Sequence, residues 1–228
     1  MKYFLDSAKL DEIKFAYHTF GIDGVTTNPK HVMNSGKSFY AFLRDISDWV
    51  KEEGLDGKEV FPISVEIDPN LTDPGKMIEM GKEVSALCSN FVIKIPCTEE
   101  GIEAARKLEK MNIRTNLTLV FSTAQAIIAG KNHSMYVSPF IGWKESNGED
   151  CRKYIEDICT IYEQYGFKGK TEIICAAIRT PKQMVDCALA GADIVTAGIE
   201  VYKDSFRHPF TNQGLGIFCD AWNNTVCD

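Results

Sequence analysis

Short runs rich in β-branched and aromatic residues recur along the chain, and stretches with helical spacing of their apolar residues separate them. The runs predict eight β-strands, at residues 3–5, 24–27, 60–67, 91–95, 114–120, 135–140, 172–178 and 193–196. Apolar residues at helical intervals predict helices between most of the strands, for example at residues 102–108, 157–165 and 184–190. Regular alternation of strands and helices is typical of parallel βαβ units.

Local signals mark where several helices begin and end. Thr180 and Ser122 each precede a glutamine by three residues, which predicts two capping boxes. Asp73 before Pro74 predicts a third helix start. Helix exits or turns are predicted at Gly54, Gly130, Gly166 and Gly191.

Eight strand–helix units in 228 residues leave about 28 residues for each unit, which suits a compact barrel. We therefore predict an α/β fold, a single (β/α)8 TIM barrel over residues 1–228 with a C-terminal helix at about 210–222. A doubly wound open sheet is the alternative. It would require a glycine-rich phosphate-binding turn after an early strand, and Gly214-Leu-Gly216 follows no predicted strand.

Composition narrows the functional classes. Charged residues make up 25% and apolar residues 44%, as in ordinary globular proteins, and the net charge is 25 − 32 = −7. No basic block offsets this charge, so binding to nucleic acid or to an anionic membrane is not expected. No apolar run reaches about 18 residues, and Asp6 interrupts any signal-peptide core. We expect a cytoplasmic protein with no membrane span.

Cysteine and histidine patterns indicate neither disulfides nor metals. No two of the eight cysteines have the C-x-x-C spacing, so free thiols are expected, at positions 88, 97, 151, 159, 175, 187, 219 and 227. The four histidines are scattered, at positions 18, 31, 133 and 208. No metal and no organic cofactor is predicted.

Polar residues in the predicted strands follow one parity. In strand 91–95, Lys94 lies between Ile93 and Ile95, so Lys94 is expected to face the barrel lumen together with Val92 and Pro96. The same rule brings other polar or aromatic side chains to the carboxyl ends of the strands, at Asp6, Thr26, Asn28, Glu66, Asn116, Thr118, Ser138 and Phe140. That end of the barrel is where barrel enzymes have their active sites.

A lysine buried in the lumen suits imine chemistry. Burial disfavours the ammonium form, so we expect a lowered pKa for Lys94 and a neutral amine that attacks a carbonyl carbon. Asp6 and Glu66 would move protons while a carbon–carbon bond breaks or forms, as in a class I aldolase. The alternative is a Lys94–Glu66 salt bridge that only fills the barrel.

Several segments together resemble the transaldolase family, in its small-subunit branch that includes fructose-6-phosphate aldolase. They are Phe4-Leu-Asp-Ser-Ala8, Gly24-Val-Thr-Thr-Asn-Pro29, Val92-Ile-Lys-Ile-Pro96, Thr115-Asn-Leu-Thr-Leu-Val-Phe-Ser122, Tyr136-Val-Ser-Pro-Phe-Ile-Gly142, Ile178-Arg179 and Ala190-Gly-Ala-Asp193. The resemblance implies a (β/α)8 barrel that assembles as a pentamer or decamer, with its terminal helix packed on a neighbour.

The resemblance also implies roles for individual residues. Lys94 would form the Schiff base, Asp6 would transfer protons near it, and Glu66 would act through a water that Thr118 orients. Asn28, Asn116, Thr26 and Ser138 would hold the dihydroxyacetone part of the substrate. The aldolase branch typically has glutamine at the place of Glu66 and tyrosine at the place of Phe140. Both positions therefore favour transfer of the three-carbon unit to an aldehyde such as glyceraldehyde 3-phosphate or erythrose 4-phosphate.

One region departs from the family pattern. Arg179 matches one arginine that binds the substrate's phosphate tail, but Trp143 stands where the second is expected and Ala177 stands where a serine is expected. Lys144 could restore the charge. The ketose donor could therefore be fructose 6-phosphate, an unphosphorylated sugar, or a sulfonate such as 6-deoxy-6-sulfofructose. Cleavage to free dihydroxyacetone and a non-catalytic sugar-binding barrel are the alternatives to transfer.

Overall fold

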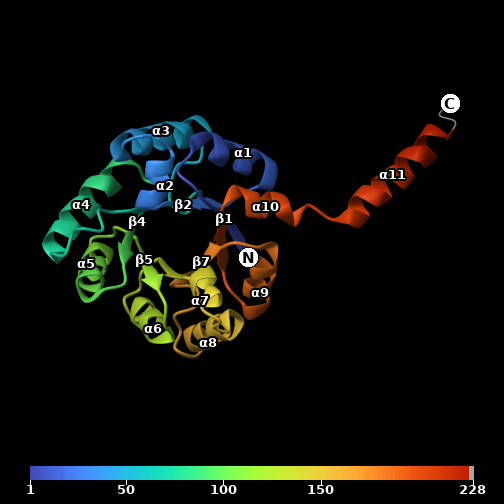
Figure 1. Ribbon diagram of the computed structural model, residues 1–228. Helices are drawn as coiled ribbons and strands as arrows, with labels where there is room; N and C mark the ends of the chain where they lie inside the picture. The colour runs from blue at the N-terminus through green and yellow to red at the C-terminus, as the bar shows by residue number, and fades with distance from the viewer. Residues whose placement is uncertain (226–228) are drawn as a thin grey trace.

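A computed structural model describes residues 1–225 of the chain. Cys227 and the end of the expected domain lie outside the described residues. Eight parallel strands close into a barrel in chain order, so the predicted (β/α)8 TIM barrel is confirmed (Figure 1). The strands are β1 (Lys2–Asp6), β2 (Gly24–Thr26), β3 (Ile63–Glu66), β4 (Phe91–Pro96), β5 (Thr115–Val120), β6 (Tyr136–Pro139), β7 (Glu172–Ile178) and β8 (Ile194–Ala197).

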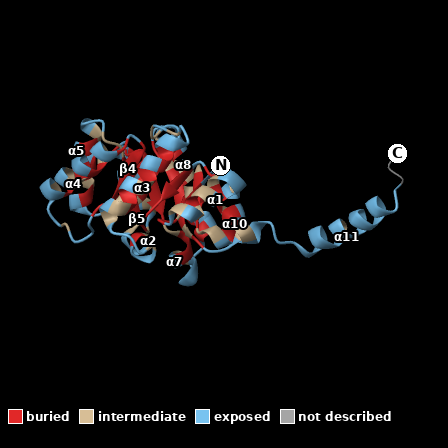
Figure 2. Ribbon diagram, turned by 90° about the horizontal axis from the view of Figure 1, so that it is seen from above, coloured by how far each residue is buried: buried red, intermediate tan, exposed pale blue. Residues whose placement is uncertain are grey.

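Helices surround the barrel, and the last helix projects away from it (Figures 1 and 2). They are α1 (Leu10–Phe20), α2 (Pro29–Asn34), α3 (Phe39–Glu52), α4 (Pro74–Leu87), α5 (Glu99–Lys110), α6 (Thr123–Lys131), α7 (Ile141–Ser146), α8 (Cys151–Gln164), α9 (Pro181–Ala190), α10 (Ile199–Ser205) and α11 (Pro209–Asn223). The short helices α2, α7 and α10 are additions that the sequence pattern did not predict. Each follows a strand directly and lies at the carboxyl end of the barrel.

The predicted starts of α4, α6 and α9 are confirmed by their caps. The side chains of Asp73, Ser122 and Thr180 each accept a hydrogen bond from the backbone three residues later. The prediction for Gly130 is wrong, because this residue lies inside α6 rather than at its exit. A Cβ at that position would lie 2.6 Å from the Phe167 ring, so close packing explains the glycine.

The third strand begins later than predicted, at Ile63 instead of residue 60. Val60 is exposed in a turn, whereas Phe61 is buried against Tyr17 and Trp49, with ring centroids 5.7 and 5.6 Å away. The apolar run at 60–67 therefore has two parts. The first is a turn in which Phe61 packs against helices α1 and α3, and the second is the strand that begins at Ile63.

The barrel lumen contains two layers with different chemistry. The amino-terminal layer is apolar and forms a cluster distinct from the core between strands and helices, with Phe4, Val92, Met135, Tyr136, Ile174 and Ile194. Two residues further along β1, β4 and β6 stand Asp6, Lys94 and Ser138, so the layer above is polar. The lumen is therefore filled with apolar side chains at its amino-terminal end and lined by polar side chains at its carboxyl end.

Two of the strands are distorted near the mouth of the barrel. β5 shifts register against β6 around Leu119, and β7 shifts against β8 around Ala177. Both residues have φ values in the left-handed region, 57° and 58°, which is uncommon for residues other than glycine. The distortions bend both strands at the end where the polar layer lies. Within residues 1–225, no helix is long and apolar enough to cross a membrane.

Gly24 allows the first strands to approach closely beside the apolar layer. A Cβ at this position would lie 2.7 Å from the carbonyl oxygen of Pro62 and 2.7 Å from the Phe4 ring. We expect Gly24→Ala to lower the free energy of unfolding by about 1–3 kcal/mol, measured by urea denaturation. The matched control is Gly216→Ala on α11, where a Cβ meets nothing within 4 Å. Equal stability of the two variants would contradict the close approach.

Candidate active site

Lys94 and Glu66 form a buried ion pair in the polar layer. They face each other in the register of β3 and β4, and Nζ of Lys94 lies 3.1 Å from Oε2 of Glu66. Their side chains are only 6% and 9% exposed. Nζ also donates to the carbonyl oxygen of Thr27 at 2.9 Å. Because an unpaired buried ammonium is strongly unfavourable, these two partners account for a lysine in the lumen.

Asn116 lies next to Lys94 in the register of β4 and β5 and is held by hydrogen bonds on both sides. The Ser138 hydroxyl donates to its Oδ1 at 2.8 Å, and its Nδ2 donates to the Ser64 hydroxyl at 3.0 Å. All three side chains are fully or almost fully buried. The chain of hydrogen bonds therefore fixes the rotamers of the groups beside the amine.

Thr118 is a buried hydroxyl with an open hydrogen-bonding position. It lies opposite Pro96 in the register and two residues beyond Asn116, on the same face of β5. Among the described residues, its Oγ1 has no hydrogen-bond partner. Buried polar atoms are normally satisfied, so this hydroxyl fits a bound water or a substrate group.

Asp6 ends β1 with both carboxylate oxygens engaged. Oδ1 accepts a hydrogen bond from the Thr26 hydroxyl at 2.9 Å, and Oδ2 lies 3.1 Å from Nε2 of His31. Thr26 lies 2.6 Å from the Thr196 hydroxyl, which must donate because the single Thr26 proton points to the carboxylate. Burial raises the pKa of Asp6, but His31, Lys94 and Thr26 outweigh burial and hold this pKa below its usual value.

A cavity of about 220 Å³ lies at the carboxyl end of the barrel, and Glu66, Asn116 and Thr118 are not part of its lining. Its lining includes seven of the predicted site residues, Asp6, Thr26, Asn28, Lys94, Ser138, Phe140 and Trp143. Asn28 also caps α2, because its Oδ1 accepts from the backbone N–H of His31 at 2.9 Å. The Nδ2 group of Asn28 has no partner among the described residues and is available to a ligand.

Aromatic rings form one rim of this cavity. Phe140 and Trp143 are 5.6 Å apart between centroids in an edge-to-face arrangement, and Phe121 contacts both. Trp143 is 55% exposed, although it lines the cavity. The rim therefore presents apolar surface and one indole N–H where the resemblance to transaldolases predicts a guanidinium.

Lys144 does not reach the cavity. Its ammonium donates to the carbonyl oxygen of Phe121 at 3.0 Å, pairs with Glu149, and lies 4.7 Å from the centre of the Tyr154 ring. Its role in binding the substrate's tail stays a prediction that this geometry does not support.

Arg179 packs against α7 and is not among the residues that line the cavity. Its Nη1 donates to the Ser146 hydroxyl at 2.8 Å, and its Nε would lie 3.1 Å from a Cβ at Gly142. No carboxylate pairs with this guanidinium in the described part of the chain. No carboxylate of the described residues therefore neutralises the positive charge of Arg179, which lies beside Gly142, the residue before Trp143.

Sequence reasoning missed three polar residues that line the cavity, namely Lys30, His31 and Thr196. Thr196 follows the lumen parity of β8 and could have been found by the rule that located Thr26. Lys30 and His31 lie in the first turn of α2, where no strand parity applies. Their position after Asn28-Pro29, at the end of a strand, was the available signal.

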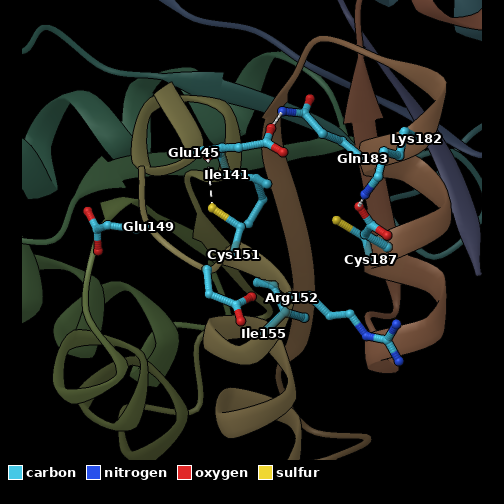
Figure 3. Close-up of a pocket in the computed structure, with 11 residues that line it drawn as sticks. Ile141, Glu145, Glu149, Cys151, Arg152, Ile155, Lys182, Gln183 and Cys187 are labelled. Carbon is cyan, nitrogen blue, oxygen red and sulfur yellow. Dashed lines mark hydrogen bonds and ion pairs between the residues drawn. The ribbon is translucent and has the colours of Figure 1, made fainter. Parts of the chain in front are cut away.

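A second hollow, of about 340 Å³, lies between α7, α8 and α9 (Figure 3). It contains none of the predicted site residues. Its charged groups are already paired, since Lys182 contacts Asp186, Arg152 contacts Glu156, and Gln183 donates to Glu145. The barrel mouth, with its free donors and buried amine, is therefore the candidate active site.

The arrangement can support imine chemistry without further groups. The amine of Lys94, the carboxylate of Asp6 and several hydroxyl and amide groups line one cavity, and the Glu66 carboxylate contacts the amine. Among the described residues, no cluster of three or more histidine, cysteine or acidic side chains could hold a metal ion. The seven cysteines of the described part are free.

Comparison with known proteins identifies relatives over the whole chain. Residues 3–225 match the family model described as transaldolase/fructose-6-phosphate aldolase. The chain is 54% identical over 228 residues to proteins named 6-deoxy-6-sulfo-D-fructose transaldolase from Priestia aryabhattai and Priestia megaterium, covering all of this chain and 98% of each relative.

More distant relatives agree in family and in fold. A probable transaldolase of Dictyoglomus turgidum is 42% identical, with 97% of this chain and 98% of that protein covered. A solved structure titled "Native KDPGal structure" matches with a TM-score of 0.57 at 15% identity, covering 91% of this chain and 84% of that one. This last likeness supports the barrel fold alone.

The buried amine leads to a direct chemical test. Borohydride reduction in the presence of a ketose should add a stable mass to the peptide that contains Lys94, because reduction traps an imine. Lys94→Ala should lose both the adduct and the activity, whereas the surface control Lys107→Ala should keep both. An adduct that persists in Lys94→Ala would place the nucleophile elsewhere.

Proposed function

The chain belongs to the transaldolase/fructose-6-phosphate aldolase family and is a transaldolase, and on that premise we propose that its ketose donor is 6-deoxy-6-sulfofructose. The observation that carries this proposal is 54% identity over the full length to proteins named for that donor. In the structure, the aromatic rim at Trp143 supports the same donor.

The proposed reaction begins at Lys94. Lys94 first gives its ammonium proton to Glu66, and the neutral amine then adds to the ketose carbonyl and loses water to give an iminium ion. Glu66 exchanges protons during this step through a water bound at the free Thr118 hydroxyl. Asp6 then takes the proton of the C4 hydroxyl while the C3–C4 bond breaks, and the bond's electrons move into the iminium to give an enamine.

The three-carbon unit then waits for an acceptor. The leaving aldehyde departs, an acceptor aldehyde adds to the enamine, and Asp6 returns a proton to the new alkoxide. Asn28 and Asn116 would bind hydroxyl groups of the retained unit, with Thr26 and Ser138 lining the same pocket. Phe140 has no hydroxyl that could protonate the enamine, which favours transfer over release of dihydroxyacetone.

The charge around the cavity suits a sulfonate tail. A sulfonate has a single negative charge, whereas a phosphate monoester has about 1.5 to 2 near pH 7. The Trp143 indole provides a neutral donor in place of a second guanidinium, and Ala177 provides no hydroxyl. A site with fewer cationic side chains therefore suits the less charged sulfonate tail.

Lys30 provides the cation that was expected from Lys144. It lines the cavity, and no carboxylate pairs with its ammonium among residues 1–225. Together with Trp143, it would contact the tail of the donor, while Arg179, packed against α7, would add positive charge nearby.

We also propose a homo-oligomer, a pentamer or decamer. The terminal helix α11 extends away from its own barrel (Figure 1). Leu215, Phe218 and Trp222 are 57%, 72% and 70% exposed and lie at helical spacing i, i+3 and i+7. An exposed apolar stripe of this kind favours packing on a second subunit.

Donor competition tests the substrate proposal. With one acceptor, the purified enzyme should use 6-deoxy-6-sulfofructose with a kcat/KM at least tenfold above that for fructose 6-phosphate, equivalent to about 1.4 kcal/mol. Equal or faster use of fructose 6-phosphate would remove the sulfonate proposal and leave the transaldolase activity intact.

Trp143→Arg tests the structural reason for that preference. A second guanidinium favours the more charged phosphate, so the ratio of the two kcat/KM values should move toward fructose 6-phosphate by about tenfold. Trp143→Phe is the matched control, because it keeps the aromatic rim and adds no charge. An unchanged ratio in Trp143→Arg would exclude this position from the tail site.

Introducing negative charges into the apolar stripe of α11 tests the assembly. Phe218→Asp combined with Trp222→Asp should dissociate the oligomer, as measured by light scattering after size exclusion. The control Gln213→Glu adds a charge to the same helix on the side away from this stripe and should keep the mass of the wild type. A wild-type mass in the double variant would contradict a role for this stripe.

A further inference from the structure

His31 and Asp6 together form the wall between two hollows at the barrel mouth. Both residues line the active-site cavity, and both also line a hollow of about 310 Å³ between the β1 end and α10. The imidazole is 29% exposed and the carboxylate 22%, with Nε2 of His31 3.1 Å from Oδ2 of Asp6. This contact is outside the reaction roles assigned above.

The backbone around His31 is fixed by the cap of α2. Pro29 occupies the first position of the helix, and the N–H of His31 donates to Oδ1 of Asn28 at 2.9 Å. Because the cap uses backbone atoms of His31, its imidazole is free to extend across to β1. The same loop therefore positions the amide of Asn28 and the imidazole that contacts Asp6.

The contact determines which protonation state of Asp6 is favoured. Thr196 donates to Thr26, Thr26 donates to Oδ1, and Nε2 of His31 faces Oδ2. Protonation of the carboxyl group would remove the negative charge that both contacts stabilise. The ionised form accepts both interactions and is the form that can take a proton from a substrate hydroxyl.

The other charged groups around His31 come from four elements. Lys94 faces it across the cavity from β4, and Lys30 precedes it on α2. In the hollow beside α10, Lys9 and Glu12 pair with each other at 3.1 Å, and Glu200 of α10 pairs with Lys203 at 2.8 Å. Asp6 is thus the carboxylate that remains for the imidazole.

We infer that His31 is a positioning residue for the reaction, holding Asp6 ionised and aimed so that it accepts the proton of the donor's hydroxyl group. This inference rests on the role proposed for Asp6 and is independent of the donor's tail.

The test is the pH dependence of kcat/KM for whichever ketose is the better donor. Loss of the imidazole raises the pKa of Asp6, so the acid limb in His31→Phe should move to higher pH, by on the order of one unit. The loss of activity should therefore be greatest at low pH. His31→Gln places an amide N–H near the position of Nε2 and should recover part of the shift. A uniform loss at every pH, or an unmoved acid limb, would overturn the inference.

A double-variant cycle separates this inference from the role of Asp6. Asp6→Asn alone should lower kcat/KM by about 10²–10⁴-fold, and full activity in that variant would reject the proton-transfer role itself. In the Asp6→Asn background, His31→Phe should cause little further loss, because its target is gone. Independent, multiplying losses would show that His31 acts on something other than Asp6.

Discussion

The buried contact between Lys94 and Glu66 is the constraint that organises the rest of the barrel. Two charges that are each less than a tenth exposed cost several kcal/mol of desolvation apiece unless each has a close partner. The register of β3 and β4 supplies that partner, and the Thr27 carbonyl supplies another. The apolar layer below and the core between strands and helices offset the remaining free energy. A well-packed lower lumen is therefore a condition for a charged upper lumen.

Strand parity explains how much of this site could be predicted from the sequence. The period of two is local, so Lys94 between two isoleucines already indicated which face it occupies. The same rule placed Glu66, Asn116 and Thr118 on the lumen face before any contact was known. Parity gives a face but no distance, and the 3.1 Å pair depends on the register between strands, which the sequence pattern does not contain.

Apart from Thr196 on β8, the residues that sequence reasoning misplaced or missed lie on helices. Trp143 and Lys144 are neighbours in sequence, but successive residues on a helix point about 100° apart. One therefore lines the cavity while the other turns to the Phe121 carbonyl and the Tyr154 ring. The contact between His31 and Asp6 depends on how α2 packs across the end of β1. Such packing between elements leaves no periodic trace in the chain.

The division between strand and helix residues also bears on specificity for the substrate's tail. The groups proposed to make and break bonds lie on strands, where hydrogen-bonded register and a buried ion pair fix Lys94 and Glu66 together. The groups proposed to contact the substrate's tail, Lys30 and Trp143, lie at the first turns of α2 and α7. A side chain there can change without altering the β3–β4 register or the Lys94–Glu66 pair. A common imine-forming barrel can therefore accept donors with different acidic tails through substitutions confined to these two turns.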